Sequence, residues 1–305
     1  MNGFSKVLVT GGAGFIGSHL VDKLISRGYS VVVLDNFHSG KMKSFREVLG
    51  RESFEMIEGD IRDRKALREA MDGVDAAVHL AALIDVKESV NNPLETHDVN
   101  VNGTLNVLNE AVRSGVRKLL FASSTAVYGE ANPLPLKEGF SPDPVSPYAA
   151  SKVSAEYYCK AFNKCYGLGT VILRYFNVYG PGQRHGVYSG VITKFLQNAL
   201  RDEPLVVYGD GKQTRDFIHI DDVVDATVLA LEKVNSKSET FNVCTGKPTS
   251  VNELVRIMEE VVGSALRVTY DKPRKGDIKN NFGDPSKAEK ILGFEVKMGR
   301  LVNMV

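Results

Sequence analysis

Short apolar runs alternate with helical patterns over the first half of the chain. The runs are nearly continuous and rich in β-branched residues, which is typical of strands buried on both faces of a parallel sheet. The predicted strands are Lys6–Thr10, Ser30–Asp35, Phe54–Glu58, Asp75–Leu80, Lys118–Ser123 and Val171–Tyr175. Alternation of this kind predicts an α/β fold with a doubly wound parallel sheet and right-handed crossovers.

Helical periodicity fills the gaps between these strands. After the first strand, Ile16, Leu20 and Leu24 recur at every fourth position, and Arg27-Gly28 supplies a helix stop. The other helices predicted in this half are Arg64–Met71, Asn100–Ser114 and Tyr148–Tyr166. Each strand is therefore followed by a segment that can cross over to the next strand.

The alternation loosens in the second half of the chain. Three stretches rich in glycine, tyrosine and polar residues favour loops. They span residues 180–190, 206–215 and 272–277. A further helix is predicted over Asp221–Glu232 and a further strand over Thr240–Val243. We expect these last two elements to return to the large sheet, so the smaller, loop-rich part is discontinuous in sequence.

Composition and charge exclude several classes of protein. In 305 residues, 38 Lys and Arg face 37 Asp and Glu, which lacks the basic excess of a dedicated nucleic-acid-binding protein. No apolar run approaches the roughly 20 residues that span a bilayer, and no signal-peptide pattern opens the chain. Neither the cysteines nor the histidines have the spacing of a metal site. We expect a cytoplasmic protein that binds no metal, nucleic acid or membrane.

A glycine motif follows the first predicted strand. Residues 10–17 read Thr-Gly-Gly-Ala-Gly-Phe-Ile-Gly and contain G-x-G-x-x-G between a strand and a helix. Glycines there allow a tight turn and a close approach of the backbone to a pyrophosphate, which binds at the helix N-terminus. The motif predicts a dinucleotide site of the Rossmann type. The alternative is a tight strand-to-helix turn without a ligand.

Acidic residues end the next two strands. Asp35 lies 23 residues after Gly12, where a carboxylate binds the adenosine ribose and repels a 2′-phosphate. This position favours NAD over NADP. Asp60 follows the third strand and is either an adenine contact or a solvated turn residue.

Tyr148 and Lys152 form a Y-x-x-x-K motif at the start of a predicted helix. Ser146 is a suitable N-cap and Pro147 a suitable first residue, so Tyr148 and Lys152 lie one turn apart on the same face. A phenol with an ordinary pKa near 10 becomes a useful base when an ammonium, a cationic nicotinamide and a helix N-terminus favour its anion. Ser124 ends the fifth strand, at the sheet edge where ligands bind. The alternative for Tyr148 and Lys152 is that they are ordinary side chains on a helix surface. The alternative for Ser124 is a hydroxyl that bonds to local backbone.

Together these motifs resemble those of the extended short-chain dehydrogenase/reductase family, and within it the nucleotide-sugar epimerases and dehydratases. The resemblance covers nearly the whole chain. It includes TGGAGFIGSHL at 10–20, HLAA at 79–82, VNVNGT at 99–104, SSTAVYG at 123–129, RYFNVYGP at 174–181, TRDFIHIDD at 214–222 and RKGD at 274–277. It implies bound NAD, a UDP-sugar substrate and a homodimer paired through the helices predicted at 100–114 and 148–166.

The resemblance also implies roles residue by residue. The implied catalytic residues are Ser124, Tyr148 and Lys152. The implied NAD contacts are Gly11, Gly14, Phe15, Ile16, Gly17, Asp35, Asn36, Asp60, Ile61, Ala81, Ala82, Asn100, Ser123, Tyr148, Lys152 and Phe176. The implied substrate contacts are Ser124, Thr125, Tyr148, Asn177, Val191, Tyr208, Arg215, Arg274 and Asp277. The implied domains are a Rossmann domain over residues 1–174 and 217–243 and a nucleotide-sugar domain over 175–216 and 244–305.

One departure separates the subfamilies. Dehydratases and decarboxylases of this family carry an acidic residue directly after the catalytic hydroxyl, whereas this chain has Thr125-Ala126. Without that extra acid or base, the resemblance favours NAD-dependent inversion at C4 of a UDP-hexose through a 4-keto intermediate. Asn281, where some epimerases carry a bulky tyrosine, leaves room for an N-acetylated sugar as well. The alternatives are a nucleotide-sugar dehydratase or decarboxylase and a non-catalytic NAD-binding protein.

Overall fold

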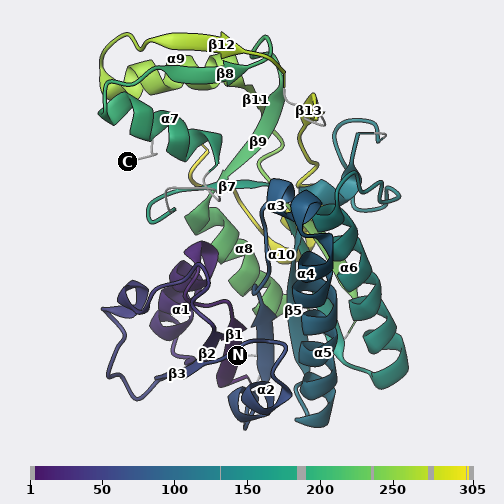
Figure 1. Cartoon of the computed structure of the whole chain (residues 1–305). Helices are drawn as coiled ribbons and strands as arrows, with labels where there is room; N and C mark the ends of the chain where they lie inside the picture. Colours follow the sequence, from purple (N-terminus) through teal and green to yellow (C-terminus); the bar gives the residue numbers. More distant parts are fainter. Residues whose placement is uncertain are drawn as a thin grey trace.

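A seven-stranded parallel sheet forms the centre of the larger part of the chain (Figure 1). The computed structural model describes residues 4–130, 132–183, 190–234, 237–273, 278–299 and 301. The strand order is β10-β6-β5-β4-β1-β2-β3, and every neighbouring pair runs parallel. The bounds are β1 Lys6–Thr10, β2 Ser30–Asp35, β3 Phe54–Glu58, β4 Ala76–His79, β5 Lys118–Ser124, β6 Gly169–Tyr175 and β10 Glu239–Val243. The predicted doubly wound α/β sheet is confirmed.

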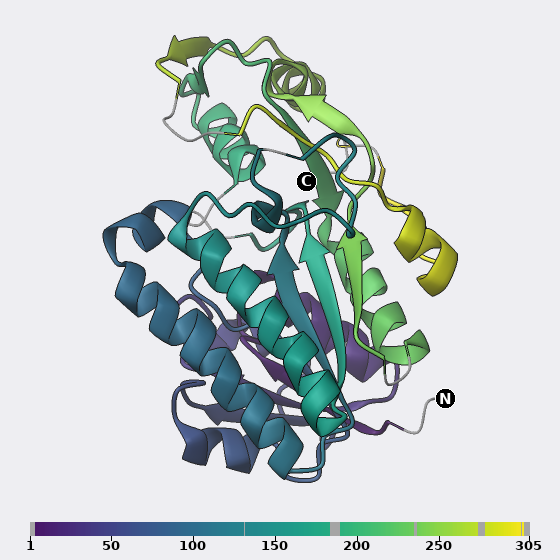
Figure 2. The same ribbon diagram turned by 90° about the vertical axis from the view of Figure 1, so that its right-hand side faces the viewer.

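Helices cover both faces of this sheet, as Figures 1 and 2 show from two sides. One face packs against α1 (Phe15–Ser26) and α8 (Ile220–Lys233). The other packs against α2 (Arg64–Ala70), α5 (Gly103–Arg113) and α6 (Pro147–Tyr166). Two separate apolar cores result, one on each face, which is why the strands read as continuous apolar runs.

Short helical turns lie between the longer elements. They are η1 (Met42–Phe45), α3 (Val86–Asn91), α4 (Pro93–His97), η2 (Asp98–Asn102) and η3 (Thr125–Tyr128). The helix predicted from Asn100 therefore differs from the observed one, because η2 is a single π-helical segment and α5 begins only at Gly103. Such π segments occur frequently at functional sites.

Two small sheets form the second part of the structure, above the large sheet in Figure 1. Their strands are β7 (Asn177–Tyr179), β8 (Leu205–Tyr208), β9 (Thr214–His219), β11 (Pro248–Ser250), β12 (Val268–Asp271) and β13 (Asn280–Asn281). Helices α7 (Val191–Leu200) and α9 (Val251–Val262) share a third apolar core with them, and α10 (Ser286–Leu292) packs against α8 and β10. The stretch 206–215, predicted as loop, holds the ends of β8 and β9 around the turn at 209–211.

β10 belongs to the large sheet although residues 176–238 separate it from β6 in the sequence. The exact domain boundaries stay a prediction. Within the part of the chain that the structure describes, no helix combines the length and apolar character needed to cross a bilayer.

Candidate active site

The turn between β1 and α1 has no room for a side chain at Gly11 or Gly17. Gly11 has φ +71°, and a Cβ on it would lie 2.7 Å from the backbone nitrogen of Ala81. A Cβ on Gly17 would meet the carbonyl oxygen of Gly11 and lie 2.6 Å from the Cα of Gly12. The first turn of α1 therefore rests directly on the strand-to-helix turn, as a pyrophosphate cradle requires.

The N-terminus of α1 has no side-chain cap. Gly14 is the N-cap residue, and the first helical residues are Phe15 and Ile16. The backbone N–H groups of this first turn are consequently available to an anion, and the helix dipole adds positive potential there. The residues predicted to hold the pyrophosphate thus fit a dinucleotide phosphate.

Asp35 is anchored beside this turn. Its side chain is buried, and its two oxygens accept hydrogen bonds from the backbone nitrogens of Ala13 at 2.9 Å and Phe37 at 2.8 Å. These bonds fix the carboxylate next to the glycine turn, at the position where the fingerprint places the adenosine ribose.

Asp60 is held by neighbouring side chains. Arg62 donates to both of its oxygens at 3.0 Å, and the Asn36 amide donates to Oδ2 at 3.0 Å. The hydrogen bonds from Arg62 are the largest cause that lowers the pKa of Asp60. Asp60 thus joins the segments after β2 and β3, and its role as an adenine contact stays a prediction. The adjoining Ile61 is buried.

A chain of buried hydrogen bonds joins the ends of β1 and β4 to η2. The Thr10 hydroxyl lies 2.7 Å from His79 Nδ1, and His79 Nε2 lies 2.9 Å from the Thr104 hydroxyl. Since Thr104 donates to the carbonyl of Asn100, it accepts from His79, so the imidazole proton sits on Nε2. Burial lowers the pKa of His79 to about 3, and the charge of Lys152 adds to this effect.

Asn100 fixes the loop after β4. Its side-chain oxygen accepts from Leu83 N at 2.8 Å, and its Nδ2 donates to Leu83 O at 2.9 Å and to Ser151 Oγ at 3.0 Å. Because these bonds occupy the amide, Asn100 shapes the loop containing Ala81 and Ala82. Sequence reasoning assigned no role to Thr10, His79 or Thr104; the signals for them were the matched segments TGGAGFIGSHL, HLAA and VNVNGT that contain them.

Ser124, Tyr148 and Lys152 lie at the carboxyl end of β5. The Ser124 hydroxyl accepts from Ala126 N at 3.2 Å and lies close enough to the Tyr148 phenol to lower its pKa. Lys152 is buried, donates from Nζ to Ala122 O at 2.9 Å, and places Nζ 6.0 Å from the Tyr148 ring centroid. The structure therefore brings the predicted catalytic residues together.

Burial governs the acidity of these groups. Burial raises the pKa of Tyr148, and the nearby Ser124 hydroxyl lowers it in part. Burial lowers the pKa of Lys152 to about 8, with Cys159 and Glu156 opposing. Desolvation disfavours the charged form of each group. Tyr148 consequently needs added positive charge in the site before it becomes a base at neutral pH.

The start of α6 is fixed from two sides. Ser146 caps the helix by accepting from Ala149 N at 3.1 Å, as predicted from its N-cap preference. The backbone N–H of Tyr148 donates to Ser89 Oγ at 3.1 Å, from α3. The cap and the α3 contact set the position of the phenol.

The two remaining predicted NAD contacts are engaged within the protein. Ser123 is buried and donates from its hydroxyl to Glu156 Oε1 at 2.6 Å. Phe176 is also buried, and its ring lies against the backbone of Gly283, where a Cβ would come within 2.5 Å of Cζ. These contacts with α6 and with the segment after β13 tie the sheet edge to its surroundings.

A cavity of about 230 Å³ opens among the small sheets. Four of the predicted substrate residues line it: Asn177, Val191, Tyr208 and Arg215. Asn177 Nδ2 donates to Asp216 O at 3.1 Å, and Arg215 Nη1 donates to Thr214 O at 2.8 Å. The predicted substrate residues Arg274 and Asp277 lie outside the described residues.

Thr125 links η3, the catalytic turn that directly follows Ser124, to β13 of the four-stranded small sheet. Its hydroxyl donates to Asn281 Oδ1 at 3.0 Å, and Asn281 is only 3% exposed. Asn281 pairs with Arg215 in the register of β13 and β9. The position singled out for sugar size thus lies beside the residue that follows Ser124.

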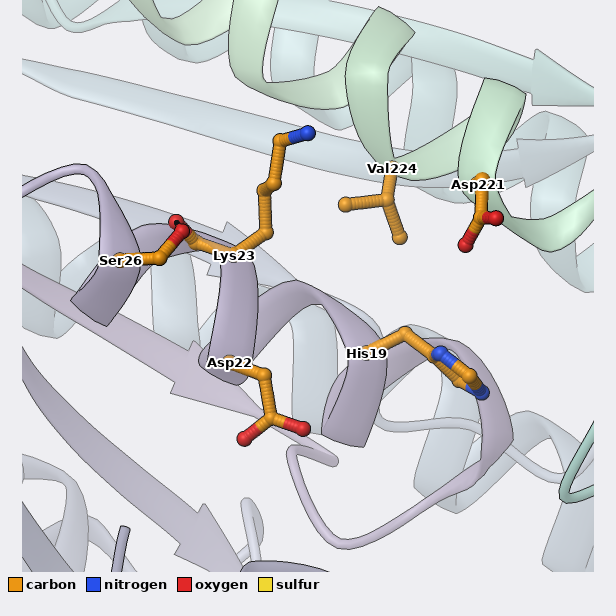
Figure 3. A pocket seen from close by; sticks show the side chains of 6 residues that line it. All are labelled: His19, Asp22, Lys23, Ser26, Asp221 and Val224. Carbon is orange, nitrogen blue, oxygen red and sulfur yellow. Dashed lines mark hydrogen bonds between the residues drawn. The ribbon is translucent and has the colours of Figure 1, made fainter. Parts of the chain in front are cut away.

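A second hollow, of about 290 Å³, lies between α1 and α8 (Figure 3). Its lining is His19, Asp22, Lys23, Ser26, Asp221 and Val224. None of these is a predicted site residue, and the hollow mixes carboxylates with a lysine that is paired to Asp225 at 2.7 Å. We place the candidate active site at the trio and the first cavity. Among the described residues no cluster of His, Cys, Asp or Glu could hold a metal ion.

Known proteins are similar to this chain in sequence and in fold. A protein from Methanocaldococcus jannaschii, provisionally named a UDP-glucose 4-epimerase, is 44% identical over 288 residues, covering 93% of this chain and 92% of its own. A UDP-N-acetyl-alpha-D-glucosaminuronate decarboxylase from Bacillus cytotoxicus is 38% identical, covering 87% of this chain and 83% of its own. Similar sequences thus carry out more than one reaction.

Solved structures agree over almost the full length. The Thermotoga maritima UDP-glucose 4-epimerase with UDP-glucose superposes with a TM-score of 0.92 at 40% identity, covering 98% of this chain and 96% of the other. The UDP-N-acetylglucosamine 4-epimerase from Methanobrevibacter ruminantium, in complex with UDP-N-acetylmuramic acid, gives 0.93 at 39% identity, covering 100% and 96%. A sequence profile of the NAD dependent epimerase/dehydratase family matches residues 7–244. The chain belongs to this family, which confirms the family and the NAD dependence expected from its motifs.

Proposed function

We propose that the protein inverts the configuration at C4 of a UDP-hexose, interconverting UDP-glucose and UDP-galactose. The observation that carries this proposal is the Ser124 hydroxyl near the Tyr148 phenol and a buried Lys152, with no carboxylate at positions 125 and 126. Phenol, hydroxyl and ammonium suffice to move one proton at the 4-hydroxyl. Elimination or decarboxylation needs a further acid or base next to Ser124, and Thr125 instead donates its hydroxyl to Asn281.

The chain's residues divide the proton chemistry between them. Bound NAD supplies a reversible acceptor for a hydride from C4. Tyr148, as phenolate, takes the proton of the sugar 4-hydroxyl, and Ser124 donates a hydrogen bond to the same oxygen. Lys152 uses one N–H for Ala122 O, which leaves two for the nicotinamide ribose and for stabilising the phenolate. Tyr148 returns the proton after the 4-keto sugar has turned over, so C4 inverts.

The smaller part of the structure holds the nucleotide in this proposal. Residues 175–216 and 244–305 form the substrate domain, and Arg215 and Arg274 bind the pyrophosphate through charge-assisted hydrogen bonds. Binding energy placed on the remote UDP retains the intermediate while the sugar stays free to rotate.

The sugar pocket in this proposal also accepts UDP-N-acetylglucosamine. Asn281 is a small side chain held beside Thr125 at 3.0 Å, next to the catalytic turn. A tyrosine there would fill space that an N-acetyl group needs. The similarity to the Methanobrevibacter ruminantium UDP-N-acetylglucosamine 4-epimerase supports this wider substrate range.

We also propose that the protein is a homodimer. Apolar side chains are exposed on α6, one of the two helices expected to pair, and on α3 and α4, which pack against it; among them are Val90 at 61%, Leu94 at 85% and Tyr157 at 58%. Pairing through this side of the molecule would cover them. Light scattering on the purified protein tests this, and a monomer at micromolar concentration contradicts it.

The experiment that tests the reaction incubates purified protein with UDP-glucose and separates the products. UDP-galactose formed without added NAD is expected, since NAD is regenerated in each turnover and stays bound. A Tyr148→Phe protein is the matched control for contaminating activity. A 4-keto-6-deoxy sugar from UDP-glucose, or a pentose from UDP-glucuronic acid, would overturn the epimerase proposal in favour of a dehydratase or decarboxylase.

A further inference from the structure

A buried ion pair lies directly behind the candidate catalytic residues. Arg174, on β6, donates from Nε to Glu156 Oε1 at 2.9 Å and from Nη2 to Oε2 at 2.7 Å. Both side chains are 2% exposed. Ser123, the neighbour of Ser124, donates to the same carboxylate at 2.6 Å. One carboxylate thus joins the end of β5, the middle of α6 and the end of β6.

The arginine extends this cluster to the segment after the catalytic turn. The Arg174 guanidinium lies 4.6 Å from the Tyr128 ring centroid, and Nη1 lies 3.4 Å from the Glu138 carbonyl. The Tyr128 hydroxyl donates to Asn242 Oδ1 at 2.6 Å. The segment fixed in this way runs from the end of η3 toward Ser146, the cap of the helix that carries Tyr148.

Glu156 also continues the line of catalytic residues on α6. Tyr148, Lys152 and Glu156 follow at intervals of four, so they lie on one face of the helix, each about 5 to 6 Å from the next at Cβ. Cys159 and Glu156, both on α6, oppose the lowering of the Lys152 pKa by burial. No sequence motif had marked Glu156 or Arg174 for this role.

The other titratable groups that face Lys152 are neutral at physiological pH. They are Tyr148 and Cys159 on α6, where burial raises each pKa, and His79 on β4, where burial lowers the pKa to about 3. Arg174 donates to both oxygens of the Glu156 carboxylate. Glu156 is therefore the anion that acts on the ammonium of Lys152.

We propose that Glu156 is a positioning residue for the catalytic trio. Its carboxylate, oriented by Arg174, holds Ser123 in place beside Ser124 and keeps Lys152 in its charged form. This positioning role depends on the proposed function in one respect, namely that Lys152 takes part in the reaction. A buried ion pair alone gives little net stability compared with apolar residues of the same volume, so stability does not account for this arrangement.

A Glu156→Gln variant separates charge from shape, because the amide keeps the size and an oxygen acceptor for Ser123. The titration of Lys152 is followed by the 13Cε NMR signal of labelled lysine, assigned with a Lys152→Met protein. We expect the titration midpoint of Lys152 to fall by about one pH unit from its parental value, as the loss of a nearby opposite charge predicts. Glu110→Gln is the matched control: Glu110 is another buried glutamate, 2% exposed, whose partner is Arg68 on α2.

A double variant, Glu156→Gln with Arg174→Met, covers the case in which the single variant fails to fold, because it leaves no unpaired buried charge. The midpoint of Lys152 should fall less in it than in the single variant, because loss of the Arg174 cation raises the pKa of a nearby lysine. An unchanged midpoint in the folded single variant, a midpoint above the parental value in the double variant, or an equal shift in Glu110→Gln would overturn the proposal.

The activity measurement is kept separate from the NMR titration. In an active enzyme, the alkaline limb of kcat/KM for UDP-glucose should move down with the Lys152 midpoint. Lack of epimerase activity in the parental protein counts against the proposed function alone, since the Lys152 titration is read without substrate. An alkaline limb that stays fixed while the midpoint moves would refute the link from Glu156 to catalysis.

Discussion

Replacing Gly17 by alanine tests the glycine cradle most directly. Gly17 lies in the first turn of α1, and an added Cβ would meet the carbonyl oxygen of Gly11 and lie 2.6 Å from Gly12 Cα. Both contacts are backbone atoms, which cannot rotate away as a side chain can. The helix must therefore move away from the β1–α1 turn to admit one methyl group.

The expected cost follows from two opposing effects. Alanine is favoured over glycine inside a helix by about 1 kcal/mol. Overpacking of a tight contact costs about 1 to 3 kcal/mol, and the contacts at Gly17 belong at the upper end because two backbone atoms are involved. We expect a net loss of about 1 to 2 kcal/mol in the free energy of unfolding. The displaced N–H groups should weaken NAD binding at least about tenfold, or about 1.4 kcal/mol.

Two measurements check this prediction. Urea unfolding gives the change in stability, and calorimetric titration of NAD into the NAD-free protein gives the change in affinity. Gly139→Ala is the control, since no heavy atom lies within 4 Å of a Cβ there, and its effect should stay below about 0.5 kcal/mol. A Gly17→Ala protein with parental stability and parental NAD affinity would refute the packing argument.

Three further predictions concern catalysis, specificity and pH. Tyr148→Phe should lower kcat by about 10² to 10⁴ while the NAD content of the purified protein stays unchanged; parental turnover would remove Tyr148 as the base. Asn281→Tyr should lower kcat/KM for UDP-N-acetylglucosamine relative to UDP-glucose by about tenfold or more, and an unchanged ratio of the two would contradict its role in sugar size. Burial lowers the pKa of His79 to about 3, so below pH ~6.5 only the unfolded chain takes up this proton; His79 should therefore remove about 1.4 kcal/mol of stability per pH unit as the pH falls from ~6.5 toward that value. Urea unfolding at several pH values should show a shallower fall for His79→Asn, whereas equal slopes would exclude His79 as the source.

The catalytic trio shows which features follow from the local sequence and which require the folded structure. Tyr148 and Lys152 are one helical turn apart, so their common face follows from helix geometry alone. Ser124 and Tyr148 lie on different elements, and their approach required the assembled sheet edge. The acidity of the phenol was predicted only in part: the sequence indicated charges that favour the anion, whereas burial of Tyr148 raises its pKa.

The hydrophobic pattern did not predict the short strands in the smaller part of the structure. β8 has four residues and β13 has two, too few for a period of two to be recognised against glycine-rich surroundings. These strands exist because they pair with β12 and β9 across long stretches of chain. Tertiary pairing, and not local propensity, determines them.

The amino-acid sequence by itself determined the large sheet, the glycine turn and the identity of the candidate catalytic residues. Each depends on patterns within about 20 residues, where strand, turn and helix geometry constrain the chain directly. The tertiary structure alone decided the contacts from Thr125 to Asn281 and from Ser123 to Glu156 and Arg174. These partners lie on separate elements and have no periodic signature, and only folding buries them where their charges and hydrogen bonds must be satisfied together.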